Sequence, residues 1–178
     1  VLDTIPTKKY ELYQDKNLLN EDDIIFKKPS STDLLLFEST LEKILTNINV
    51  GSKRFLTNKV DRSVSGLIAQ QQCVGPFHIP LSNFSLTSLG FLDTKGTVAS
   101  IGEQPIKGIM NNISGVEMSI GEMLTNLIFC KISDFNEIKC LGNWMWSPKL
   151  SGQGYLLYEA ANHCAYVLKK LGIGIDGG

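Results

Sequence analysis

Two oxygen-bearing side chains, those of Glu122 and Asn126, stand four residues apart in a segment whose apolar residues recur at helical spacing. Residues at i and i+4 lie on one face of a helix, so a carboxylate and an amide oxygen can point at the same site. Hard cations such as magnesium prefer these oxygens and often bridge them to phosphates. The spacing alone favours an exposed polar helix face, and both interpretations stay open at this point.

A second polar region, residues 56–76, places charged and amide side chains on both sides of a short apolar block. The block, Val64 to Ala69, has apolar residues at positions i, i+3 and i+4, which predicts a short helix. Val74-Gly-Pro76 then ends this helix, because the residue before a proline disfavours the helical region. The polar loops on either side could carry function, and a capped surface helix is the alternative.

The chain has four cysteines and no CxxC pair, which argues against a zinc ribbon or a thioredoxin-type motif. Cys130 and Cys164 stand in apolar helical patterns, where buried free thiols are expected. Together these features indicate a reducing, cytoplasmic setting. Cys73 and His78 could be imagined as a loop nucleophile and base, but this interpretation is disfavoured. His163 stands on a helix, where a structural role is expected.

Composition places the chain among ordinary globular proteins. With 178 residues, of which 43% are apolar and 20% charged, it suits one domain with a real core. The net charge of −1 gives no reason to expect a nucleic acid or a membrane surface as partner. No apolar run is long enough to span a bilayer, and no secretory signal opens the sequence.

The elements that must position these residues follow from periodicity and capping. Residues 1–32 indicate a linker or the end of a preceding domain, in a fragment of a longer protein. Residues 83–89 and 97–101 predict a strand hairpin around the turn at 93–96. The remaining predictions are helices at 33–46, at 115–131 with a Ser114–Glu117 capping box, and at 154–171, and strands at 138–146 and 173–176. This mixture predicts an α+β fold: about four strands in one sheet, with helices on one face.

Four motifs in register add a family resemblance. They are Thr57-Asn-Lys-Val-Asp-Arg-Ser-Val64 with Gly66-Leu67 and Ala69–Pro76, then Gly102-Glu-Gln-Pro105, Gly121-Glu-Met-Leu-Thr-Asn126 and Gly142-Asn-Trp-Met-Trp146. Over about residues 50–178 the chain resembles phosphoribosylformylglycinamidine synthase in its long, single-chain form. It ends at Asp176-Gly-Gly178, where that family continues with a lysine-aspartate-serine motif.

The resemblance implies that residues 33–178 are an N-terminal-type domain of the aminoimidazole-ribonucleotide-synthetase-like superfamily, truncated at the glycine-rich loop. In such domains the other sheet face pairs with a like domain, so self-association is expected. The implied partners are small-molecule nucleotides and the rest of the same enzyme chain, which comprises the first-half synthetase domains and a glutaminase domain. The segment resembles the second such domain of the synthase.

The resemblance also assigns site residues. Glu122 and Asn126 match residues that hold Mg²⁺ at an auxiliary ATP/ADP site. Asn83 stands where the family has an aspartate ligand, so one negative charge is missing. Ser82, usually alanine, and Lys53 are expected at the nucleotide, with Lys53 near its phosphates. Apart from the resemblance, Asp61, Arg62 and the Gln70–Gln72 run could face the substrate, because an arginine suits a ribose phosphate; a solvent-facing loop is the alternative.

The implied reaction converts formylglycinamide ribonucleotide, ATP and glutamine to the amidine, ADP, phosphate and glutamate. This segment would carry half of the auxiliary site and no catalytic residue, so alone it is expected to be inactive. The alternative is a non-catalytic nucleotide-binding or assembly module with a degenerate metal site. Relatives of selenophosphate synthetase or thiamine-phosphate kinase are a weaker possibility, against which the Gly142–Trp146 motif argues.

Overall fold

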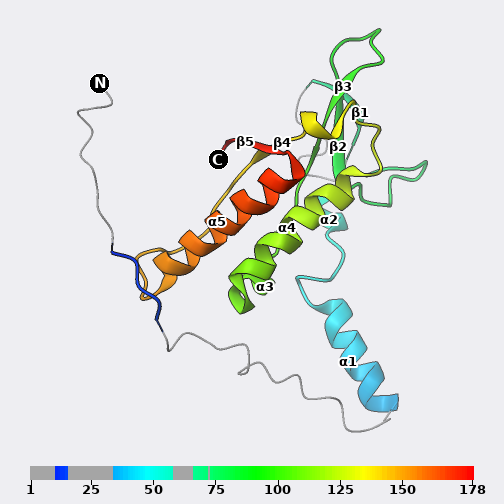
Figure 1. Ribbon diagram of the computed structural model, residues 1–178. Helices are drawn as coiled ribbons and strands as arrows, with labels where there is room; N and C mark the ends of the chain where they lie inside the picture. The colour runs from blue at the N-terminus through cyan, green and yellow to red at the C-terminus, as the bar shows by residue number, and fades with distance from the viewer. Residues whose placement is uncertain (1–10, 16–33, 58–65, 72) are drawn as a thin grey trace. The chain divides into compact units, whose positions relative to one another are not determined.

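The computed structural model describes residues 11–15, 34–57, 66–71 and 73–178, and its elements are drawn in Figure 1. The chain divides into two compact units. One spans Ile25–Ile101 and is called here the hairpin unit; the other combines Val1–Ile24 with Gly102–Gly178 and is called the C-terminal unit. The mixture of helices and small sheets confirms the predicted α+β class.

The hairpin unit is built around a three-stranded antiparallel sheet in the order β1-β2-β3. Its strands are β1 (Leu67–Gln70), β2 (Phe84–Ser88) and β3 (Gly96–Ser100), and its helices are α1 (Leu34–Thr46) and α2 (Arg54–Thr57). Strands β2 and β3 pair in continuous register, and the hydroxyl groups of Thr87 and Thr97 lie 2.8 Å apart across them. The predicted hairpin is therefore confirmed.

Strand β1 (Leu67–Gln70) corrects one prediction, because Leu67 to Ala69 were expected at the end of a short helix. Gly66 has a φ of +67°, a left-handed conformation that ends any helix running into this segment. Ile68 then pairs with Thr87 of β2, so an existing strand edge supplies the backbone hydrogen bonds that a helix would have made internally. The residue pattern of this segment fits both a helix and a strand, and pairing with β2 determines that it forms a strand.

Helix α1 confirms the helix predicted at 33–46, but its apolar residues are not buried. Phe37, Leu41, Ile44 and Leu45 keep helical spacing and are between 42% and 63% exposed. Their exposure shows that no described residue of the hairpin unit covers this face.

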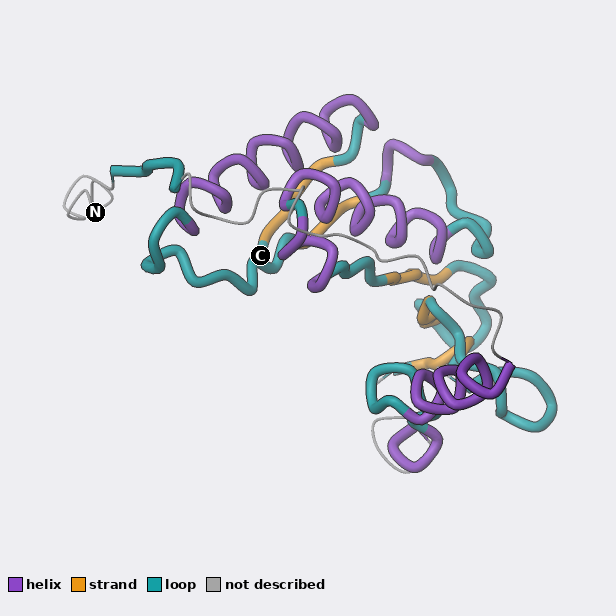
Figure 2. Tube along the Cα trace, turned by 90° about the horizontal axis from the view of Figure 1, so that it is seen from below, coloured by secondary structure: helices purple, strands orange, loops and turns teal. Residues whose placement is uncertain are grey.

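The C-terminal unit packs two long helices, α4 (Asn112–Leu127) and α5 (Gln153–Leu171), side by side, as Figure 2 shows. Beside them, β4 (Lys139–Leu141) and β5 (Gly174–Gly177) form a two-stranded parallel sheet, preceded by the 3₁₀ turn η3 (Phe135–Glu137). The buried cluster combines all of these elements: Ile120 from α4, Cys140 from β4, Leu168 from α5, and Ile173 just before β5. The core of this unit is therefore where helices and sheet meet.

Two features of this unit differ in extent from the sequence-based prediction. The described strands form two separate sheets, so one sheet of about four strands is not confirmed. The strand expected at 138–146 is only Lys139–Leu141; the Gly142 N–H still donates to the Gly177 carbonyl at 2.8 Å, and residues 143–146 are not in a strand. Helix α5 agrees with prediction, and Gly172 ends it in a left-handed conformation with its N–H bonded to Leu168 and Lys169 carbonyls.

Helix α4 begins earlier than expected and is capped differently. A short helix, α3 (Pro105–Met110), precedes it, and the N-cap is Asn111, whose Oδ1 accepts from the Ser114 N–H at 2.8 Å. The predicted Ser114–Glu117 capping box is therefore wrong. Glu117 instead binds His163 of α5, with 2.7 Å between Oε1 and Nε2. This contact gives His163 the structural role expected of it.

Replacing the cap should show which residue starts α4. Asn111→Ala removes the acceptor for the Ser114 N–H and is expected to lower the free energy of unfolding by about 1 kcal/mol. Ser114→Ala is the matched control and should change it by no more than a few tenths of a kcal/mol, because Ser114 lies inside the helix with an exposed side chain. Chemical denaturation followed by circular dichroism measures both. A larger loss in Ser114→Ala would restore the capping box.

Candidate functional site

The polar face of α4 carries the carboxylate and the amide side chain that the sequence places four residues apart. Glu122 and Asn126 are one helical turn apart, and both side chains are half-buried. Residues at this spacing share a helix face, so the carboxylate and the amide can serve one site. The structure thus keeps together the pair that the sequence places together.

The Glu122 carboxylate is held by the segment that precedes α3. Its Oε2 accepts from the Glu103 backbone N–H at 3.0 Å and from Gln104 Nε2 at 2.8 Å. Among the described residues, both hydrogen bonds to this carboxylate end on the same oxygen. Two sequence motifs, Gly102–Pro105 and Gly121–Asn126, therefore meet at one side chain. Residue spacing could not reveal this contact, because its partners are 18 and 19 positions apart.

Gly102 makes this contact possible through its lack of a side chain. A Cβ at this position would overlap the carbonyl oxygen of Ser119 and would lie 2.5 Å from the backbone nitrogen of Met123. Backbone atoms inside a helix cannot move aside cheaply, so only glycine lets the loop approach α4 this closely. The approach places the next two residues within reach of Glu122.

The other predicted site residues lie in the hairpin unit. Ser82 Oγ accepts from Gln70 Nε2 at 2.6 Å and donates to the Phe84 carbonyl at 2.6 Å, so its hydroxyl links β1 to the start of β2. Asn83, the next residue, is exposed. Lys53 is half-buried, and its Nζ donates to the Gly51 carbonyl at 2.6 Å. These contacts order the segments on which the three residues stand.

The predicted ligands are divided between the two units. Asn83 belongs to the hairpin unit, whereas Glu122 and Asn126 belong to the C-terminal unit. Asp61 and Arg62 lie outside the described residues. Within the described part of the chain, no cluster of three or more His, Cys, Asp or Glu side chains could hold a metal ion. A cation at Glu122 therefore needs the Asn126 amide oxygen and further ligands. The donor set fits magnesium, because both groups offer the oxygen atoms it prefers.

The cysteines supply no sign of nucleophilic chemistry. None of the four forms a disulfide, and Cys73 is buried where its backbone forms an isolated β-bridge with Leu81. Burial raises the pKa of the Cys140 thiol; burial, with a smaller contribution from Cys140, raises the pKa of Cys164. These two groups stay protonated near neutral pH and are poor nucleophiles. Cys130 and Cys164 are half-buried rather than fully buried as expected.

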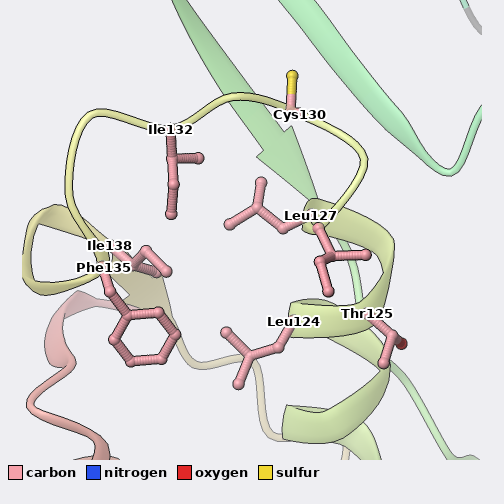
Figure 3. Close-up of a pocket in the computed structure, with 8 residues that line it drawn as sticks. Leu124, Thr125, Leu127, Cys130, Ile132, Phe135 and Ile138 are labelled. Carbon is pink, nitrogen blue, oxygen red and sulfur yellow. The ribbon is translucent and has the colours of Figure 1, made fainter.

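An apolar pocket lies near the C-terminal end of α4. It has a volume of about 320 Å³, and Leu124, Leu127, Phe135 and Ile138 line it, as Figure 3 shows. Thr125 also lines it, whereas the sulfur of Cys130 points away. The lining contains no charged side chain, so this pocket does not suit nucleotide phosphates. Separately, no helix in the described ranges has the length and apolar character needed to cross a membrane.

Comparison with known proteins agrees with the motifs. The model of the FGAR-AT PurM_N-like domain matches residues 52–178. The chain is 51% identical to the phosphoribosylformylglycinamidine synthase of Dictyostelium discoideum over 142 residues, 80% of the chain and 10% of the relative. It is 44% identical to that of Drosophila melanogaster over 178 residues, 100% of the chain and 13% of the relative.

The Homo sapiens synthase is 43% identical over 144 residues, which are 81% of the chain and 11% of that relative. The chain thus spans roughly a tenth of the length of the curated relatives it matches. The matched residues include α4, its Glu122 and Asn126, and the loop that holds Glu122. The chain therefore belongs to the family of FGAR-AT PurM_N-like domains.

Proposed function

We propose that the chain carries half of a magnesium–nucleotide site in a phosphoribosylformylglycinamidine synthase. Such an enzyme converts formylglycinamide ribonucleotide, ATP, glutamine and water to formylglycinamidine ribonucleotide, ADP, phosphate and glutamate. The chain contributes no catalytic residue in this proposal. Its partners are nucleotides and the remaining domains of a longer polypeptide, in a cytoplasmic setting that four cysteines without a CxxC pair favour.

The observation that carries the proposal is the arrangement around Glu122. A half-buried carboxylate on α4 takes two hydrogen bonds on Oε2, and an amide side chain follows one turn later. A carboxylate on a solvated helix face needs no contact with a second motif. Here the Gly102–Pro105 segment lies so close to the backbone of α4 that position 102 has no room for a Cβ. Oxygen ligands fixed in this way suit a hard cation.

The roles of the individual residues follow from their charge and chemistry. Glu122 would give a negatively charged ligand, and Asn126 and Asn83 would each give a neutral carbonyl oxygen. Bound Mg²⁺ would offset the negative charge of the nucleotide phosphates. Lys53 would add a positive charge near those phosphates, and Ser82, tied to Gln70, would keep the segment before Asn83 in place. Asp61 and Arg62 are proposed to face the substrate.

Restoring the missing charge should strengthen the site. Asn83→Asp is expected to tighten magnesium-dependent ADP binding about tenfold, because a close charge pair gains about 1.4 kcal/mol after desolvation offsets most of the Coulomb energy. Isothermal titration of ADP with and without Mg²⁺ measures the effect. Asn136→Asp, an exposed position on η3, is the matched control and should leave the affinity unchanged. Equal affinity in the parent and Asn83→Asp would remove Asn83 from the ligand set.

The neutral Asn83 itself favours a second candidate function, a non-catalytic binding or assembly module whose metal site is degenerate. The two candidates differ in what the protein retains after gentle purification. Mass spectrometry that finds ADP bound, and released by a magnesium chelator, supports the first. Protein that carries no nucleotide and binds none with Mg²⁺ supports the second.

A further inference from the structure

We infer that Gln104 is a positioning residue for Glu122, holding one carboxylate oxygen so that the other is presented to the cation. This inference rests on the proposed magnesium–nucleotide site and names a residue outside its ligand set. It starts from the 2.8 Å hydrogen bond between Gln104 Nε2 and Glu122 Oε2, which the Glu103 N–H supplements at 3.0 Å.

The place of Gln104 in the fold shows that its side chain does not serve its own helix. Gln104 is the N-cap of α3, a position where side chains commonly bond to the first backbone N–H groups. Its side chain makes no such capping bond. It reaches α4 instead, where its half-buried amide donates to Glu122. A residue chosen to start α3 would be serine, threonine, aspartate or asparagine, none of which is as long.

Fixing the carboxylate matters because of the geometry that magnesium demands. The terminal torsion of a glutamate is broad, so an unrestrained carboxylate samples many orientations. Magnesium requires nearly ideal octahedral geometry at about 2.0–2.1 Å, whereas calcium accepts longer and less regular contacts. Two donors on Oε2 restrict the rotation of the group and leave Oε1 as the ligand atom. Loss of one donor should therefore harm magnesium binding more than calcium binding.

The test compares ADP binding by calorimetry in Mg²⁺, in Ca²⁺ and without a divalent cation, on the full chain. Gln104→Met keeps the length of the side chain and removes its donor. It is expected to weaken magnesium–ADP binding about tenfold, the lower end of the range for partners of metal ligands, because the Glu103 N–H remains. Calcium–ADP binding should fall about threefold or less. ADP binding without metal should not change.

Two further variants separate positioning from folding. Gln104→Ser offers α3 a proper cap and cannot reach Glu122, so thermal stability should hold or rise while magnesium–ADP binding weakens. Gln153→Met is the matched control, because it removes a side-chain hydrogen bond of similar length, 2.9 Å to Trp146 Nε1, at the start of α5. It is expected to lower stability and to leave the affinity for magnesium–ADP unchanged.

The outcomes are distinct. If Glu122→Gln abolishes magnesium dependence and Gln104→Met matches the parent, the positioning role is wrong and the proposed site stands. Equal losses in Mg²⁺ and Ca²⁺ would also overturn the positioning role, because they indicate a general disturbance of the loop. If neither the parent nor Glu122→Gln shows any dependence on magnesium, the proposed site is wrong and the inference falls with it.

Discussion

Glu122→Gln is expected to weaken magnesium–ADP binding by at least about 100-fold, the largest effect of any single substitution at the candidate site. Glu122 is the only carboxylate among the proposed ligands, since Asn83 and Asn126 are neutral. A close charge pair at an effective protein dielectric is worth about 4 kcal/mol, and partial loss of hydration reduces this figure. A net loss of about 2.7 kcal/mol corresponds to the stated factor.

Glutamine at this position removes the negative charge but keeps an acceptor, so the effect of the charge is separated from any effect on the fold. Its carbonyl oxygen can still accept from the Glu103 N–H and from Gln104, so the loop stays attached to α4. Glu122→Ala removes both the charge and the acceptor, and it should also lower the free energy of unfolding by about 1–3 kcal/mol. The measurement is calorimetric titration of ADP in Mg²⁺, with thermal unfolding recorded on each protein.

Glu137→Gln is the matched control, because it removes an exposed carboxylate of η3 in the same unit. It should bind magnesium–ADP as the parent does. If Glu122→Gln and Glu122→Ala also bind like the parent, Glu122 and Asn126 are not metal ligands. The polar face of α4 would then be the solvated surface that the spacing alone favours.

Local signals in the sequence predict the long helices and the hairpin well. Helix α5 combines apolar periodicity with a glycine at its end, and Gly172 has the left-handed conformation that this position needs. The β2–β3 hairpin follows from a turn between two short alternating runs. In each case the residues that decide the structure are neighbours in sequence, so pattern and caps contain the necessary information.

Predictions that depend on residues outside the pattern itself are the ones that fail. Leu67 and Ile68 satisfy a helical pattern, but β2 pairs with them. Ser114 and Glu117 satisfy a capping pattern, but Asn111 supplies the cap and His163 takes the glutamate. In both cases the local pattern is compatible with two structures. Contacts with residues outside the pattern determine which structure forms.

At the candidate site, too, contacts between residues close in sequence could be predicted, and contacts between distant residues could not. Glu122 and Asn126 could be paired from their spacing, because a helix brings them together. The hydrogen bond from Gln104 to Glu122 joins residues 18 positions apart, so it could not be predicted from the sequence. The signal available was the Gly102-Glu-Gln-Pro105 motif itself, in which a glycine and a proline enclose two polar residues. A glycine beside a helix start can mark a close backbone approach.

Gly102→Ala is expected to destabilise the chain by roughly 2–3 kcal/mol, the upper range for overpacking, because the clash involves backbone rather than a flexible side chain. The added Cβ would overlap the Ser119 carbonyl oxygen and lie 3.0 Å from the Met123 Cβ. Relief requires the loop to move away from α4, which breaks the bonds from Glu103 and Gln104 to Glu122. Magnesium–ADP affinity should therefore fall together with stability.

Gly121→Ala is the matched control, because it makes the same chemical change one residue before Glu122. A Cβ there meets no atom within 4 Å, and alanine is the better helix former. This variant should raise the free energy of unfolding by about 0.5–1 kcal/mol. Thermal and chemical denaturation of the two variants should thus shift in opposite directions. Equal stability in Gly102→Ala and the parent would mean that the loop does not lie against α4 at this distance, and the hydrogen bonds that orient Glu122 would lose their structural basis.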